Sequence, residues 1–289
     1  MDREFLFFSC ACLHFHTNYP QHRSHYCVKR GVDTMTKMLI RKKGAGKRQY
    51  TIALSLLLIL IGITSVLLPV SAAGNSFSWY CAHVKDHKKP VCGAEMNFID
   101  EYSGFYIGKG DEKVVYLTFD AGYENGNVAR VLDTLKKEQV PGAFFILGHL
   151  IEAEPGLVKR MSEEGHLVCN HTYHHKDMSR ITSEEDFTAE LTSLENAYRE
   201  LTGKEPAKFY RPPEGRFSKQ NLEWAEKSGY STIFWSFGYP DWDNGKQMSP
   251  AAAKEKILSN LHPGAVLLLH PTSATNAEIL GEVIREIKQ

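Results

Sequence analysis

Residues 113–122 read KVVYLTFDAG, and this stretch decides the fold. Its apolar run at 114–119 is typical of a buried strand, and the run ends in Asp120 beside a glycine turn. Short apolar runs then alternate with amphipathic segments, which favours a parallel α/β fold. In such folds catalytic groups stand at the carboxyl ends of strands, so we expect chemistry directly after each apolar run.

The alternation predicts a domain at 113–289, preceded by a polar N-terminal extension at 75–112. Expected strands cover 114–119, 142–147, 166–169, 209–210, 231–235 and 265–269, and expected helices cover 127–138, 155–164, 183–202, 221–228, 250–261 and 277–288.

The charge balance argues against a nucleic-acid partner. Lys+Arg and Asp+Glu both number 34 in the 289 residues, so there is no overall positive field to attract a polyanion.

Residues 50–70 (YTIALSLLLILIGITSVLLPV) form an uncharged stretch that is long enough to cross a bilayer as one helix. A basic flank precedes it and the small residues Ser71-Ala72-Ala73 follow it. Residues 35–74 are therefore predicted to be a signal peptide or a membrane anchor. Either form places the residues beyond about 74 outside the cytoplasm, in the cell envelope.

Residues 1–34 contain FFSCACLHFHTNYPQHRSH, which does not resemble the start of a secretory signal. Our hypothesis is an untranslated leader, with translation beginning at Met35. The alternative is a metal-binding or disordered cytoplasmic tail.

Cys81 and Cys92 bracket a polar loop in what we expect to be an oxidising compartment. A small disulfide and two free thiols both remain open. A zinc site with His83 and His87 is a third possibility, although the spacing follows no zinc pattern.

Chemically useful side chains follow the apolar runs. Asp120 is a candidate general base, although an Asp at such a junction is often a turn or N-cap residue. His171 and His175 lie four residues apart and can converge on one metal if their segment is helical. The alternative is a solvated polar loop.

The later apolar runs end in the same way. Arg211 precedes two prolines and can bind a carboxylate bidentately. Asp241 and Trp242 follow the next strand, and His270 follows the last. Chance rarely places such groups at successive strand ends.

Five stretches in this order resemble the motifs of the polysaccharide deacetylase family, the NodB-homology carbohydrate esterases. They are TFDAGYENG (118–126), HTYHH (171–175), RPPEGRF (211–217), DW (241–242) and LLLHPT (267–272). The resemblance implies a distorted (β/α) barrel that removes N-acetyl groups from amino sugars of peptidoglycan or another N-acetylated glycan. The wider motifs look most like the delta-lactam-biosynthetic de-N-acetylases that act on N-acetylmuramic acid, which suggests a role in sporulation.

The resemblance also implies residue roles. Asp120 is the catalytic base, Arg211 orients it, and His270 is the acid that protonates the leaving amine, tuned by Asp241. A divalent metal, Zn²⁺ or similar, polarises the acetyl carbonyl. The implied metal ligands are His171 and His175, and the implied substrate-binding residues are Trp242, Leu268 and Pro213.

The chain departs from the family where Ala121 replaces an acidic metal ligand. We favour a weak two-histidine site completed by water and substrate. Glu124 or Asn125 as replacement ligands, and catalysis without a tightly held metal, are the alternatives. The chain also stops at Gln289, where the family continues into a short strand, and a truncated gene model would explain this end.

Two other functions remain open at this point. One is a chitin-oligomer or N-acetylglucosamine deacetylase. The other is a non-catalytic module that binds cell wall through the same fold.

Overall fold

The computed structural model describes residues 75–84, 86–108, 110 and 113–289. The leader at 1–34 and the hydrophobic segment at 50–70 lie outside these residues. None of the helices in the described ranges is long and apolar enough to cross a membrane.

The centre of the domain is an eight-stranded sheet in which every neighbouring pair is parallel. It forms a curled half-barrel, which confirms the α/β barrel-like fold expected from the sequence. Its strands, in spatial order, are β2 (Gly104–Phe105), β8 (Ser231–Ile233), β6 (Ala207–Tyr210), β5 (Leu167–Asn170), β4 (Ala143–Ile146), β3 (Val115–Ala121), β10 (Ala265–Leu269) and β9 (Phe237–Gly238).

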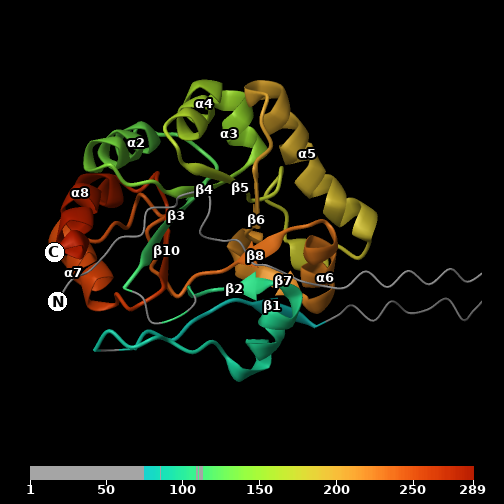
Figure 1. Cartoon of the computed structure of the whole chain (residues 1–289), viewed down its shortest axis with the longest axis horizontal. Coiled ribbons are helices and arrows are strands. Elements are labelled where there is room, and N and C mark those ends of the chain that lie inside the picture. The colour runs from blue at the N-terminus through green and yellow to red at the C-terminus, as the bar shows by residue number, and fades with distance from the viewer. Residues whose placement is uncertain (1–74, 85, 109, 111–112) are drawn as a thin grey trace, which may run out of the picture. The chain divides into compact units, whose positions relative to one another are not determined.

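The α-helices lie along the outer side of this sheet, as Figure 1 shows for α2 to α5 and for α8. Four of them begin after a serine whose hydroxyl accepts a backbone N–H of the first turn, which explains where they start. Only α3 was not predicted, because it is short and follows β4 directly. The helices are α2 (Asn127–Glu138), α3 (Gly148–Ala153), α4 (Pro155–Glu163), α5 (Glu184–Thr202), α6 (Lys219–Lys227), α7 (Pro250–Ser259) and α8 (Ala274–Lys288).

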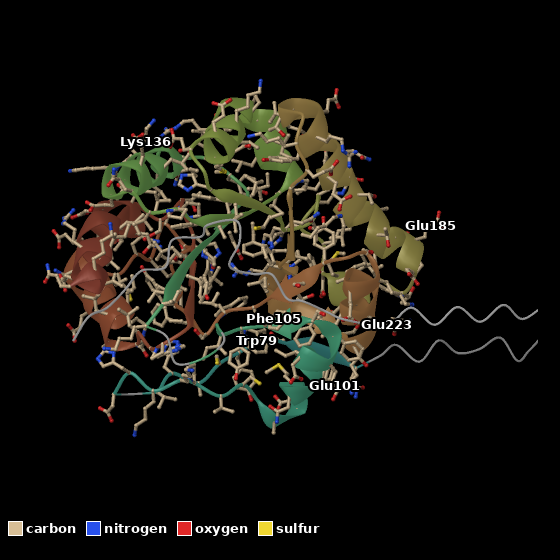
Figure 2. The ribbon with its side chains drawn as sticks, viewed as in Figure 1. Trp79, Glu101, Phe105, Lys136, Glu185 and Glu223 are labelled. Atoms are coloured by element: carbon tan, nitrogen blue, oxygen red, sulfur yellow. The ribbon has the colours of Figure 1, made fainter. Side chains whose placement is uncertain are left out.

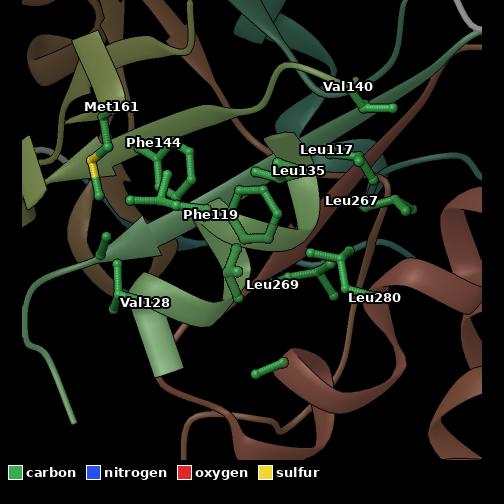
Figure 3. Close-up of a cluster of buried hydrophobic side chains, with 14 of the residues drawn as sticks. Leu117, Phe119, Val128, Leu135, Val140, Phe144, Met161, Leu267, Leu269 and Leu280 are labelled. Atoms are coloured by element: carbon green, nitrogen blue, oxygen red, sulfur yellow. The ribbon is translucent and has the colours of Figure 1, made fainter. Parts of the chain in front are cut away.

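Alternation along the strands divides apolar packing from chemistry. Leu117, Phe119 and Ala121 of β3 belong to the main hydrophobic cluster between sheet and helices. There the Phe119 ring stacks on Phe144 of β4, with centroids 4.9 Å apart (Figure 3). Since successive side chains point to opposite faces of a strand, Asp120 faces the concave side of the sheet.

The N-terminal extension is packed against the domain as well as preceding it. Its strand β1 (Ser76–Ser78) pairs with β7 (Arg216–Ser218), and its 3-10 helix η1 (Ala94–Tyr102) precedes the edge strand β2. Trp79 and Phe105 lie on this segment in Figure 2, and Trp79 stacks on Phe234 at 4.4 Å.

The extension also connects the two sides of the curled sheet. Just after β2, Ile107 forms an antiparallel bridge with Ala265 of β10, and the Gly108 N–H donates to the Gly264 carbonyl at 2.7 Å. These contacts lie at the amino end of β10, away from the strand ends that carry the chemistry.

Cys81 and Cys92 face each other across an isolated antiparallel bridge, and both are free thiols. Of the possibilities left open by the sequence, the structure therefore has the two thiols. Burial raises the pKa of Cys81 to about 12, so this thiol stays protonated. His83 stacks on Phe237 and His87 bonds to the Leu261 carbonyl, so neither forms a zinc site with the cysteines.

Substituting Gly264 should weaken the contact between the N-terminal extension and β10. Gly264 has a φ of +78°, and an added Cβ would lie 2.7 Å from the Gly108 carbonyl oxygen. We expect Gly264→Ala to lower the free energy of unfolding by about 2 to 4 kcal/mol. Gly203→Ala is the matched control, because Gly203 has a φ of +70° but open space around it, and should cost about 1 kcal/mol. Equal losses in urea titrations would contradict the role of the close approach.

Candidate active site

Asp120 and Arg211 form a buried ion pair at the carboxyl ends of β3 and β6. Arg211 Nη1 donates to Asp120 Oδ1 at 2.7 Å, and the two side chains are 0% and 10% exposed. Burial by itself raises the pKa of Asp120, but the charge of Arg211 and its hydrogen bond, together with the charge of His270, outweigh it and lower the pKa below its usual range. The carboxylate is therefore ionised, as a general base requires.

The remaining donors of Arg211 are used by the protein. Nε donates to the Ile233 carbonyl at 3.0 Å, and Nη2 donates to Thr118 Oγ1 at 2.9 Å. The guanidinium lies over the Phe145 ring, 4.0 Å from its centroid. The bidentate contact suggested by the sequence is thus wrong in detail, because one Arg211 nitrogen reaches the carboxylate while the others fix the guanidinium in the sheet.

His171 and His175 come together without forming a helix. The residues after β5 form an irregular loop in which Thr172 and His175 have φ values of 73° and 56°. The imidazole centroids are nevertheless 5.2 Å apart, and His171 Nε2 lies 3.5 Å from Asp120 Oδ2. The helical condition in the sequence argument was wrong, whereas the expected proximity is observed.

The state of His171 suits a metal ligand. Burial lowers its pKa to about 4, so the imidazole is neutral. The Nδ1 atom lies 2.8 Å from the Arg211 carbonyl oxygen, which assigns the proton to Nδ1 and leaves the Nε2 lone pair facing Asp120. Orientation of a ligating histidine by a carbonyl is common in metal sites.

The residues at and after the position of the missing acidic ligand have other partners. Ala121 is fully buried in the main hydrophobic cluster. Glu124 accepts the Gly126 and Ala129 N–H groups at the start of α2, and Asn125 donates to the Thr272 carbonyl at 2.8 Å. Glu124 and Asn125 are thus engaged in fixing the turn before α2, and their role as replacement ligands stays a prediction. Within the described ranges, no group of three or more His, Cys, Asp or Glu side chains is arranged to hold a metal ion.

His270 and Asp241 form the second charged pair. Asp241 accepts the His270 backbone N–H at 2.8 Å and lies 2.7 Å from its Nδ1. Burial lowers the pKa of His270, but the Asp241 hydrogen bond and charge prevail, and the net pKa is raised. The imidazolium form is favoured, so His270 can serve as a proton donor.

Asn276 is a supporting residue that the sequence reasoning missed. Its amide donates to the second Asp241 oxygen at 2.5 Å, and its own oxygen accepts the Tyr239 hydroxyl. It lies in the first turn of α8, where nothing in the sequence pattern separates it from an ordinary helix residue.

The three expected substrate residues occupy different environments. Trp242 is 59% exposed, and its ring meets His270 edge-on at 5.8 Å. Leu268 is 8% exposed on β10, and Pro213 is buried in the short 3-10 helix η3 (Pro213–Gly215). Trp242 alone is open to solvent beside a reactive group.

Glu190 of α5 is a second residue that was missed. Its side chain is 4% exposed and accepts the His174 backbone N–H at 3.0 Å and Lys176 Nζ at 2.6 Å. It also contacts His174 Nδ1 at 2.9 Å, so it holds the loop between the two histidines. A signal was available, because Glu190 interrupts the apolar stripe of α5 beside Phe187, Leu191 and Leu194.

Known proteins share this combination of sheet and site. Residues 107–233 match the family described as polysaccharide deacetylase. The chain is 40% identical over 213 residues to the peptidoglycan-N-acetylmuramic acid deacetylase PdaA of Bacillus subtilis, covering 73% of this chain and 81% of that protein. The chain therefore belongs to the polysaccharide deacetylase family, as the motifs predicted.

Solved structures and a further sequence relative agree with this assignment. The structure of PdaA, a family 4 carbohydrate esterase, matches with a TM-score of 0.72 at 39% identity, covering 74% of this chain and 92% of that one. The peptidoglycan-N-acetylglucosamine deacetylase of Bacillus cereus is 31% identical over 197 residues, 67% of this chain and 70% of that protein. A family 4 pseudoenzyme from Bacillus anthracis matches with a TM-score of 0.59 at 26% identity, covering 64% of each chain.

Removing Glu190 should disorganise the histidine loop, the irregular segment from His171 to His175. We expect Glu190→Ala to weaken Zn²⁺ binding about 10- to 100-fold, as loss of a supporting contact does in metal sites, in a competition titration on metal-stripped protein. Glu164→Ala is the matched control, because Glu164 is a 13% exposed carboxylate paired with Arg160 on α4. Unchanged Zn²⁺ affinity in Glu190→Ala, or an equal loss in the control, would contradict this role.

Proposed function

We propose that this chain is a peptidoglycan deacetylase that hydrolyses the N-acetyl group of N-acetylmuramic acid, the step that precedes muramic delta-lactam formation. The observation that carries the proposal is the placement of two ion-paired groups at the ends of the neighbouring strands β3 and β10: Asp120 paired with Arg211, and His270 paired with Asp241. Membership of a hydrolase family that removes N-acetyl groups from polysaccharides supports it. The muramic acid specificity rests on the similarity to PdaA.

The two groups divide the proton transfers. Asp120 takes a proton from a water molecule whose oxygen attacks the acetyl carbonyl carbon. His270 donates a proton to the sugar nitrogen as the C–N bond breaks, so the products are acetate and a free amine. Arg211 keeps Asp120 in place and ionised. Asp241 keeps His270 in place and favours its protonated form.

The imidazoles of His171 and His175 would hold a divalent cation, and water and substrate would complete its coordination. A bound Zn²⁺ or similar ion supplies Lewis acidity at the acetyl carbonyl. The free Nε2 lone pair of His171 and the 5.2 Å ring separation support this pair as ligands. Two protein ligands hold such an ion less tightly than three, so we expect the metal to exchange readily.

We also propose that the domain works outside the cytoplasm. The uncharged stretch at 50–70, with its basic flank, supports export through a signal peptide or a membrane anchor. The relatives named for peptidoglycan substrates are consistent with this location.

Acetate release from defined substrates tests the function. We expect the purified protein to release acetate from peptidoglycan faster than from chitin oligomers, and mass spectrometry of the digested product should place the loss on muramic acid. Asp120→Asn should lower the rate about 10²- to 10⁴-fold, the usual contribution of a general base. Faster release from chitin oligomers would favour the N-acetylglucosamine alternative. Binding to peptidoglycan without release would favour the non-catalytic module that a family pseudoenzyme makes conceivable.

The pH profile tests the role of Asp241. His270 must be protonated to donate, and its pKa is raised. The alkaline limb of kcat/KM should therefore lie above the ordinary histidine pKa of about 6.5. Asp241→Asn removes the charge that raises this pKa, so the alkaline limb should move to lower pH. Asp243→Asn is the control, because that carboxylate accepts the Gly245 N–H instead. An alkaline limb that stays in place in Asp241→Asn would refute the assignment.

A further inference from the structure

Large hydrophobic side chains are exposed in two places in the described part of the chain. Tyr80 and Val91 belong to the N-terminal extension, whereas Tyr123 and Trp242 follow the carboxyl ends of β3 and β9. Tyr123 is 61% exposed. Trp242 contacts His270, but Tyr123 has no part in the chemistry described above.

The turn that carries Tyr123 is fixed on both sides. Glu124 accepts the Ala129 N–H at 3.3 Å and so anchors the turn to α2. Asn125 Nδ2 donates to the Thr272 carbonyl at 2.8 Å, two residues beyond His270. The exposed ring therefore has a settled position, and binding against it requires little ordering of the protein.

A second ring supports Tyr123 from the neighbouring strand. His149, in the first turn of α3 after β4, is exposed, and its ring lies 4.8 Å from the Tyr123 ring at an interplanar angle of 47°. Because β3 and β4 are adjacent, this pair stands on the same edge of the sheet as Asp120, three residues beyond it in sequence.

The surface formed by these two rings suits a sugar. A pyranose has an apolar C–H face that packs on aromatic rings, and polar hydroxyls at its rim that the tyrosine hydroxyl and an imidazole can bond. A glycan strand continues on both sides of the unit that reacts, so its flanking units must lie along the strand-end edge.

We propose that Tyr123, backed by His149, is a binding platform for the sugar unit adjacent to the one that is deacetylated. The proposal rests on the proposed function, because the reacting sugar is taken to lie between Asp120 and His270. The platform contacts the chain of sugars and not the acetyl group, so it sets the preference for long strands.

Substrates of two lengths test the platform. Steady-state kinetics are measured with peptide-free peptidoglycan strands and with the single sugar N-acetylmuramic acid, which has no adjacent unit. For Tyr123→Ala we expect KM for the strands to rise roughly three- to tenfold, the factor that one ring contact supplies. The value of kcat should change less than twofold, and kinetics with the single sugar should not change. Tyr123→Phe should keep most of the wild-type KM.

Tyr80→Ala is the matched control, since Tyr80 is 52% exposed but lies on the extension. Equal KM values for Tyr123→Ala and Tyr80→Ala on strands, or an equal loss on strands and on the single sugar, would overturn the platform. Failure of wild-type protein to release acetate would instead overturn the proposed function. In that case, calorimetric binding of the strands to wild type and to Tyr123→Ala decides the platform, which equal affinities would refute.

Discussion

The ion pair between Asp120 and Arg211 is the interaction on which the architecture depends. Their strands, β3 and β6, are separated in the sheet by β4 and β5. In a flat sheet that separation is roughly 14 Å, too far for the 2.7 Å contact observed. The sheet must therefore curl, and curling also brings His171, which follows β5, to Asp120 and brings Arg211 to Thr118 of β3. A buried pair is costly to desolvate, and the full set of partners around Arg211 offsets that cost.

The two groups that transfer protons are each held by a side chain from another part of the chain. Arg211 on β6 holds Asp120 on β3, and Asp241, itself held by Asn276 of α8, holds His270. Glu190 of α5 holds the histidine loop, whose irregular backbone provides little support of its own. These partners are needed because groups placed on loops require outside contacts to keep a productive geometry.

Much of the fold could be predicted because local patterns decide it. The apolar runs give the strands of the central sheet, and serine caps with amphipathic periodicity give the long helices. The two-residue strands β2 and β9 could not be found, since a pair of residues shows no periodicity. Strand order was equally inaccessible, because pairing joins segments far apart in the chain.

The site residues that could be predicted are likewise those marked by a local sequence pattern. Asp120, Arg211 and His270 were found because they stand directly after apolar runs. The histidine loop was expected to be helical on spacing alone, but the left-handed conformations of Thr172 and His175 allow the rings to meet in another way. Asn276 and Glu190 were missed because their partners are distant in sequence, although an acid within an apolar helical stripe was a visible clue.

The packing of the N-terminal extension against the barrel sets the smallest part of the chain that forms an intact domain. The family match begins at residue 107, but a chain begun there would lack β1, η1 and β2. It would also expose Phe217 and Phe234, which are now buried against Trp79 and Met96. Any protease that trims the chain must therefore cut before Ser76 to leave an intact domain. Modular rearrangement of such genes must carry the extension together with the barrel.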